Sequence, residues 1–274
     1  MKDFITVIFS RDRASQCDLL LKSINACTKE YMNIHVIYTC DTDRHWRSYE
    51  KLKNRHGEAN FHIETTFKYD LISLIRYYKY VLFMVDDNIC VSDFSIEKII
   101  DLLEKNKTAL GFSLRLGANC TECYTLSCKQ EMPPSTKIAD NVFMYSWFGA
   151  NADFGYPLEL SSSIYKVSDI IPILMNENFL NPNELEWKMQ SYNYWFSTKK
   201  PHLLLYQTSA CFCNPINKIN INNNRSGNNP EYSIESLLTK YEKGVIIKYD
   251  FKGFIPNGCH QEVDIEFGLE KGEE

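Results

Sequence analysis

Residues 80–88, YVLFMVDDN, place six apolar side chains directly before two aspartates and an asparagine. An uninterrupted apolar run of this kind is typical of a strand buried on both faces of a sheet. Ionised carboxylates are too costly to bury alone, so Asp86 and Asp87 are expected where the strand ends, in a cleft or on a metal ion. Because open α/β sheets bind ligands beyond the carboxyl ends of their strands, this stretch predicts a ligand site at that edge.

The chemistry of the three polar side chains limits which kinds of ligand could bind there. Asp86, Asp87 and Asn88 all offer oxygen atoms, which suit Mg²⁺ or Mn²⁺ together with the diphosphate of a nucleotide. The alternative is an acidic turn that only caps the helix after it.

Strand and helix patterns alternate through residue 115. Strands are expected at residues 4–9, 34–39, 61–64, 80–85 and 108–114, with helical spacing of apolar residues between them. This order predicts a mostly parallel sheet with right-handed crossovers. No G-x-G-x-x-G follows a strand and no Walker A sequence occurs, so dinucleotide enzymes and P-loop ATPases are not favoured.

The pattern becomes irregular after residue 117. We expect a long loop with a hairpin at 118–140, further strands at 142–148, 156–165 and 203–207, and helices at 167–176, 181–194 and 233–243. Asn181, Pro182 and Glu184 form a helix-start signal, with Asn181 as the N-cap residue. The asparagine-rich stretch 214–230 is expected to be a flexible loop, and a hairpin-like segment is expected before residue 267.

Charge and hydropathy exclude several partners. The net charge of −5 does not suit a nucleic-acid-binding protein, whose contacts with phosphates need a basic face. No apolar run reaches the about 18 residues of a membrane span. The apolar part of residues 1–13 is too short for a signal peptide, so these residues are expected to form a strand and the chain is expected in the cytoplasm.

Ten cysteines are many for an intracellular chain. Cys120, Cys123 and Cys128, with Cys211 and Cys213 as partners, offer the soft ligands of a structural zinc site. No second C-x₂-C pair is present, and thiols that are buried or in loops are the preferred interpretation.

Several features together resemble the GT-A fold glycosyltransferases. The loop at residues 10–13, SRDR, follows the first strand, Asp41 and Asp43 follow the second, and the acidic triplet follows a buried strand. The irregular second half is a further point of resemblance. The fold class implied is α/β, with a GT-A type, Rossmann-like mixed sheet flanked by helices and an irregular acceptor-side second half.

The resemblance also implies that the two halves of the chain have different roles. Residues 1–274 would form a single GT-A-like domain. Residues 1–117 would be its nucleotide-sugar-binding half, and residues 118–274 would be its acceptor-side half with a C-terminal tail.

By this resemblance the acidic triplet corresponds to the DxD motif, which holds a divalent cation and the diphosphate of a sugar nucleotide. The implied metal ligands are Asp86, Asn88 and His260, and the implied contacts to the nucleotide sugar are Ser10, Arg11, Asp12, Arg13, Asp41, Asp86 and Asp87. Asn88 lacks the charge of an aspartate, so we expect weaker metal binding or a substitute ligand in Asp87. The alternative for His260 is a structural, hydrogen-bonded histidine.

Many inverting members of this family place their catalytic base in an acidic pair at the start of the helix that Asn181 opens. Here the sequence is NPNELE, which leaves Glu184 and Glu186 as candidates. Glu184 also has a structural explanation as the capping-box residue. Asp153 is the third candidate catalytic residue.

The predicted function is therefore transfer of a sugar from a nucleoside-diphosphate donor to a hydroxyl acceptor, dependent on Mn²⁺ or Mg²⁺ and inverting. The expected acceptor is a glycan or lipid-linked molecule in polysaccharide biosynthesis, with peripheral membrane contact as an option. One alternative is a sugar nucleotidyltransferase, although SRDRASQ lacks the glycines of its usual loop. The other is a catalytically silent sugar- or nucleotide-binding protein, suggested by Asn88 and the missing acidic pair.

Overall fold

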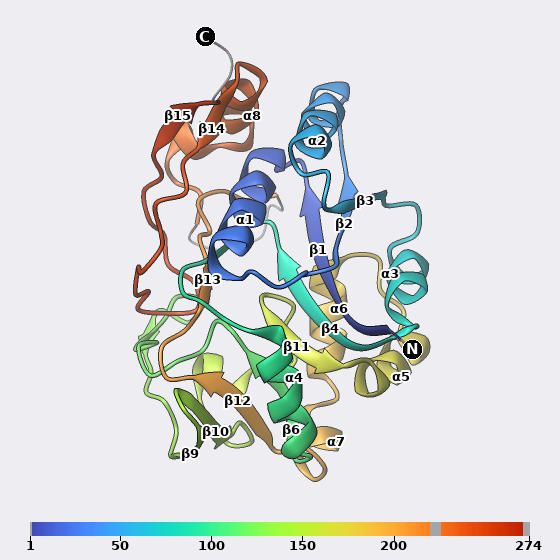
Figure 1. The fold of residues 1–274 in the computed structure, drawn as a ribbon, viewed down its shortest axis with the longest axis vertical. Coiled ribbons are helices and arrows are strands. Elements are labelled where there is room, and N and C mark those ends of the chain that lie inside the picture. Colours follow the sequence, from blue (N-terminus) through green and yellow to red (C-terminus); the bar gives the residue numbers. More distant parts are fainter. Residues whose placement is uncertain (1, 220–225, 271–274) are drawn as a thin grey trace.

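The computed structural model describes residues 2–219 and 226–270, and within them the central element is a mixed sheet of nine strands (Figure 1). Its strand order is β3-β2-β1-β4-β11-β6-β12-β10-β9. The predicted α/β class with a mixed sheet flanked by helices is confirmed.

The first four strands are parallel neighbours. They are β1 (Lys2–Arg11), β2 (Ile34–Thr39), β3 (Asn60–Ile63) and β4 (Tyr78–Val85). The helices α1 (Ala14–Cys27), α2 (Asp43–Arg55) and α3 (Phe67–Ile75) connect them. Phe9 pairs with Val85, so the polar residues that follow β1 and β4 emerge side by side.

Strands from both halves of the chain complete the sheet. The strand β11 (Ser163–Lys166) is antiparallel between β4 and β6 (Ala109–Ser113). The strand β12 (His202–Tyr206) is parallel to β6, and β10 (Val142–Ser146) and β9 (Ser135–Ala139) form an antiparallel edge.

The remaining elements surround this sheet. They are β5 (Asn88–Cys90), α4 (Ile96–Lys105), β7 (Glu122–Cys123), β8 (Cys128–Lys129), η1 (Ala152–Gly155), α5 (Val167–Asn176), α6 (Pro182–Gln190), α7 (Asn193–Ser197), β13 (Cys211–Cys213), η2 (Pro230–Tyr232), α8 (Ile234–Glu242), β14 (Val245–Ile247) and β15 (Phe267–Leu269). Figure 1 shows α8 and the β14–β15 hairpin beside α2, far from β9 and β10.

Buried apolar residues cover both faces of the sheet. In β4, Val81 and Phe83 pack into one core layer, whereas Leu82 and Met84 pack into the other. Helices α3, α5 and α6 contribute to the first layer, and α1, α2 and α4 contribute to the second. The prediction that this strand is buried on both faces is confirmed.

Several predicted elements of the second half are wrong in detail. Only residues 163–165 of the predicted strand 156–165 lie in β11, because the preceding residues form a loop in which Ser162 has φ 81°. Residues 135–139 form an exposed edge strand inside the predicted long loop. The predicted helix 181–194 ends at Gln190, and Pro172 lies inside α5.

Part of the predicted asparagine-rich loop, residues 220–225, lies outside the described residues. In the part of the chain that is described, no helix combines the length and apolarity that crossing a membrane requires.

Candidate active site

A cleft of about 550 Å³ opens at the carboxyl ends of β1 and β4. Its lining comes from the β1–α1 loop, the turn after β4, the start of α6 and the segment after β13. The position agrees with the expectation that the acidic triplet marks a ligand site at this edge.

The structure divides the predicted site residues into two groups. Those that line the cleft are Ser10, Arg11, Arg13, Asp86, Asp87, Glu186 and His260. Those outside its lining are Asp12, Asp41, Asn88, Asp153 and Glu184.

Asp86 fixes the end of β1 and the loop that follows it. Its Oδ2 accepts hydrogen bonds from the Ser10 hydroxyl at 2.9 Å and from the Arg11 backbone N–H at 3.2 Å. Its Oδ1 accepts from Arg13 Nη1 at 3.0 Å. The carboxylate is buried, so its charge is compensated mainly by the guanidinium of Arg13.

Arg13 connects three segments at the base of the cleft. Besides Asp86, its Nη1 lies 3.5 Å from Asp87 Oδ2, and its Nη2 donates to the carbonyl of Asn217 at 2.7 Å. Its Nε is buried and has no hydrogen-bond partner among the described residues. The side chain is only 9% exposed, so this cation is held in place before any ligand binds.

Asp87 is the more accessible carboxylate of the pair, with 17% of its side chain exposed. Burial raises the pKa of Asp87 to about 6, Arg13 opposes the rise and the neighbouring charge of Asp86 adds to it. A cation in the cleft would relieve this unfavourable charge.

Asn88 has a structural role in the turn from β4 to β5. Its Oδ1 accepts from the Val85 backbone N–H at 2.8 Å, and its Nδ2 donates to Cys213 Sγ at 2.9 Å. Both ends of the carboxamide are thus bonded inside the turn. This geometry does not bring Asn88 to a metal ion in the cleft.

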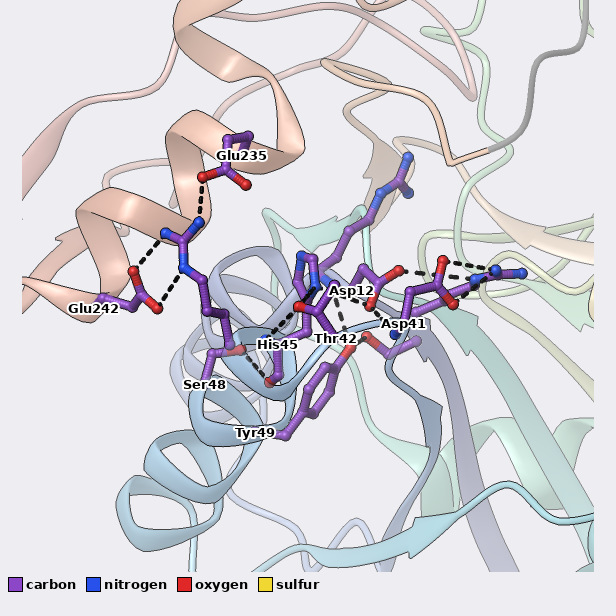
Figure 2. Close-up of polar contacts among 12 residues, drawn as sticks. Asp12, Asp41, Thr42, His45, Ser48, Tyr49, Glu235 and Glu242 are labelled. Atoms are coloured by element: carbon purple, nitrogen blue, oxygen red, sulfur yellow. Dashed lines mark hydrogen bonds and ion pairs between the residues drawn. The ribbon is translucent and has the colours of Figure 1, made fainter.

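Asp12 and Asp41 join the loops after β1 and β2, as Figure 2 shows. The Asp41 backbone N–H donates to Asp12 Oδ1 at 2.9 Å, and both carboxylate oxygens of Asp41 accept from Arg11 Nη2 at 2.8 Å. Burial raises the pKa of Asp12, whereas the hydrogen bond from Arg11 lowers the pKa of Asp41. Asp41 is half exposed, next to Arg11 at the cleft, so it remains accessible to a ligand.

Glu186 is the candidate base that the structure places in the cleft. Its Oε1 accepts from the Tyr156 hydroxyl at 3.1 Å, and its Oε2 accepts from the Leu160 backbone N–H at 2.9 Å. Burial raises the pKa of Glu186, Arg115 opposes the rise and Glu159 adds to it. The carboxylate is therefore held in one position and is more basic than an exposed glutamate.

The other two candidate bases, Glu184 and Asp153, make hydrogen bonds outside the cleft. Glu184 is exposed, its backbone N–H donates to Asn181 Oδ1 at 3.0 Å, and its Oε2 accepts from the Leu180 N–H at 2.9 Å. Asp153 is buried and accepts from Gln130 Nε2 at 2.9 Å. Their geometry supports a helix cap and a structural pair instead of a role in the cleft.

His260 lines the cleft beside β13, where it forms a β-bridge with Cys213. Its Nδ1 is buried without a hydrogen-bond partner in the described part of the chain, and burial together with Arg115 lowers the pKa of His260 to about 4. A neutral imidazole with an unused nitrogen suits a transition-metal ion.

Residues 2–219 and 226–270 contain no cluster of three or more His, Cys, Asp or Glu side chains with metal-site geometry. Mg²⁺ and Mn²⁺ need only one or two protein ligands when a substrate supplies phosphate oxygens, and Asp87 and His260, which both line the cleft, carry donor atoms of the kind such an ion takes. Cys120, Cys123 and Cys128 belong to no such cluster, and all ten cysteines, each within the described residues, are free thiols.

Asn217 is a site residue that sequence reasoning missed. Its side-chain amide pairs with that of Gln16, with Nδ2 donating to Gln16 Oε1 at 3.2 Å, while its carbonyl accepts from Arg13. Asn217 lies in a stretch whose composition indicates only a loop. No local sequence pattern predicts the contact with Gln16, because it joins residues about 200 positions apart in the chain.

Comparison with curated proteins finds one relative with significant sequence similarity. No family model matches the chain. The bifunctional glycosyltransferase pgtA of Dictyostelium discoideum is 28% identical over 187 residues, which are 61% of this chain and 24% of that protein. The matched region therefore spans about a quarter of the relative's length.

The solved structures that match the chain do so at low identity and low TM-score. S. aureus TarS 1–349 in complex with UDP-GlcNAc is 13% identical, with a TM-score of 0.46 over 77% of this chain and 57% of that chain. The mannosyltransferase PcManGT from Pyrobaculum calidifontis, in complex with GDP-Man and Mn²⁺, is 9% identical, with a TM-score of 0.42 over 76% and 58%. A cytidylyltransferase from Leptospira borgpetersenii is 9% identical, with a TM-score of 0.45 over 77% and 78%.

Similarities at this level say nothing about the chemistry of this chain. The curated relative is a glycosyltransferase, and the mixed α/β sheet with a cleft at the carboxyl ends of β1 and β4 is the architecture that the sequence motifs predicted.

Proposed function

We propose that this chain transfers a sugar from a nucleoside-diphosphate donor to a hydroxyl group of a carbohydrate or lipid-linked acceptor. The observation that carries the proposal is a single cleft that contains a fixed arginine, an accessible carboxylate and a partly buried glutamate with a raised pKa: Arg13, Asp87 and Glu186. The relationship to a curated glycosyltransferase supports the same reaction class.

The loop after β1 is suited to hold the donor. Arg11 and Arg13 supply two cations at the carboxyl edge of the sheet, where they can bind the diphosphate by charge-assisted hydrogen bonds. Asp41, next to Arg11, can accept hydrogen bonds from the ribose hydroxyls. The interactions of Asp86 and Asp12 keep this loop in one conformation and so reduce the entropy lost on binding.

Asp87 and His260 would hold a divalent cation together with the donor phosphates. When bound, the ion supplies Lewis-acid stabilisation of the negative charge on the departing nucleoside diphosphate. Arg13, which lies 3.5 Å from Asp87, adds a permanent positive charge beside the same leaving group.

Glu186 would accept the proton of the acceptor hydroxyl as that oxygen attacks the anomeric carbon, which gives inversion. The hydrogen bonds from Tyr156 and Leu160 orient its carboxylate, and a raised pKa increases its basicity. Proximity in a preformed cleft supplies a further part of the rate enhancement.

A donor screen tests the proposal. The purified chain is incubated with a panel of nucleotide sugars, with Mn²⁺ or with a chelator, and released nucleoside diphosphate is measured. We expect release from one donor with Mn²⁺, reduced at least a hundredfold in Asp87→Asn and unchanged in the matched control Glu184→Gln.

The screen separates the alternatives. Binding of a nucleotide without release, with any acceptor, would support the catalytically silent binding protein. The absence of both release and a thermal shift with every nucleotide would refute the glycosyltransferase proposal.

A further inference from the structure

Exposed apolar side chains lie at the cleft and on α6. Leu180 lines the cleft and is 76% exposed, Tyr156 contacts Glu186 and is 37% exposed, and Trp187 follows Glu186 and is 67% exposed. Asn183 lines the cleft, and because residues four apart share a helix face, Trp187 lies one turn beyond it. We name Tyr156, Leu180 and Trp187 the apolar ledge.

The fold does not require a tryptophan at this position. The residues by which α6 packs into the core are Leu185 and Met189, both fully buried. The Trp187 indole instead is mostly exposed, and Lys188 Nζ lies 5.2 Å from the centroid of its ring. An exposed apolar surface at the rim of a cleft is typical of a binding site.

The composition of the ledge favours a carbohydrate over a lipid surface. Flat aromatic faces next to the amide of Asn183 and the carboxylate of Glu186 match the apolar C–H faces and hydroxyl groups of sugar rings. Residues 180–200 carry three lysines and two glutamates, a net charge of +1. This is far less basic than the segments that bind anionic membranes.

We propose that the ledge binds the acceptor as an oligosaccharide of at least two units. The sugar that receives the transferred residue lies at Glu186, and its neighbour stacks on Trp187. Asn183, which lines the cleft near Glu186, and Trp187 are four residues apart, a rise of about 6 Å along the helix, which is close to the length of one sugar unit. The proposal rests on the proposed function for the reaction and adds the class of acceptor.

Binding to immobilised neutral hexose oligosaccharides, from one to four units long, tests this proposal with the full chain. We expect affinity to rise between one and two units, and Trp187→Ala to lower it at least fivefold for two or more units. Monosaccharide binding and nucleoside-diphosphate binding should not change in this variant. Trp187→Phe should retain most of the affinity, because a flat ring is kept.

The matched control is Tyr31→Ala. Tyr31 is 76% exposed and precedes β2, at the end of that strand away from the cleft, so its removal should leave oligosaccharide binding unchanged. Equal affinities of Trp187→Ala and the unmodified chain, or no binding to any oligosaccharide, would overturn the proposal.

A second binding experiment uses vesicles of phosphatidylcholine and phosphatidylglycerol to test whether the ledge contacts a membrane instead. Binding to these vesicles that depends on Trp187, without oligosaccharide binding, would overturn the proposal in favour of a membrane contact. Nucleoside-diphosphate binding in the same samples reports on the proposed function separately. If no nucleoside diphosphate binds but oligosaccharides still bind in a Trp187-dependent way, the proposed donor is refuted, whereas the proposed binding of oligosaccharides to the apolar ledge stands.

Discussion

Asp86 and Asp87 are neighbours in the sequence but have different surroundings, and this difference separates stability from function. Asp86 is buried and bonded to Ser10, Arg11 and Arg13, whereas Asp87 is partly exposed in the cleft with an elevated pKa. Substitution of Asp86 should therefore reduce stability much more than substitution of Asp87.

Asp86→Ala should lower the free energy of unfolding by about 3 kcal/mol, since it leaves the Arg13 charge buried beside a single remaining carboxylate. Asp87→Asn removes an ion that burial disfavours and should change stability by less than about 1 kcal/mol. Urea unfolding at pH 7 measures both. A larger loss in Asp87→Asn than in Asp86→Ala would contradict this assignment of roles.

The protonation of Glu186 should control the acid side of the pH–rate profile. A base must be ionised, so kcat/KM should fall as the pH decreases through the pKa of Glu186, which burial places above the ordinary 4.5. The Tyr156 hydrogen bond lowers this pKa, so Tyr156→Phe should move the acid limb to higher pH. An acid limb that does not move in Tyr156→Phe would argue against Glu186 as the base.

At the residue scale, the sequence predicts the place of the acidic pair but not the roles of its neighbours. Carboxylates that follow a buried apolar strand must lie beyond its end, and this local rule locates Asp86 and Asp87 correctly. Whether Asn88 faces the cleft or the turn depends on Cys213, which lies 125 residues away. Similarly, the orientation of α6 distinguishes Glu186 from Glu184, and no local pattern encodes that orientation.

The start of α6 is an element that local sequence specifies well. Asn181 caps the helix through the Glu184 backbone N–H, and Pro182 occupies the first helical position. The neighbouring loop that ends at β11 is held instead by distant groups, among them Glu186 at the Leu160 N–H and Arg115 near Glu159. The predicted strand at 156–165 was wrong because these long-range contacts are absent from any local window.

The pairing of α1 with α2 provides a test at the scale of elements. Asp18 of α1 is fully buried, accepts from His56 Nε2 at 2.8 Å and pairs with Lys22 at 2.5 Å. Burial alone would raise the pKa of Asp18, but His56 and Lys22 hold it below the ordinary 3.8. The ionised carboxylate therefore stabilises the fold above about pH 4, and this contribution is lost as the pH falls further.

Asp18→Asn should accordingly lower the free energy of unfolding at pH 7 by about 3 kcal/mol. The difference from the unmodified chain should shrink as the pH falls below 3.8. Unfolding curves between pH 3 and pH 7 measure this trend, and a difference that stays constant over the range would contradict it.

At the scale of the whole molecule, residues from both halves of the chain build one sheet and one cleft. The first half supplies β1 to β4 and the acidic pair, and the second supplies β11, Glu186, Asn217 and His260. Strand–helix alternation predicts the first part, because each connection there is local. The strand order of the second part follows from pairings between distant segments, which periodicity does not contain.

The central claim is that this cleft binds the nucleotide part of a sugar donor. Hydrogen–deuterium exchange of the full chain, with uridine or guanosine diphosphate and Mn²⁺ in turn, tests it most directly. The account predicts slower exchange at residues 10–13, 39–42 and 86–88 with one nucleotide, and loss of this protection in Asp87→Asn. Protection confined to other segments, or no change with either nucleotide at saturating concentration, would contradict the claim.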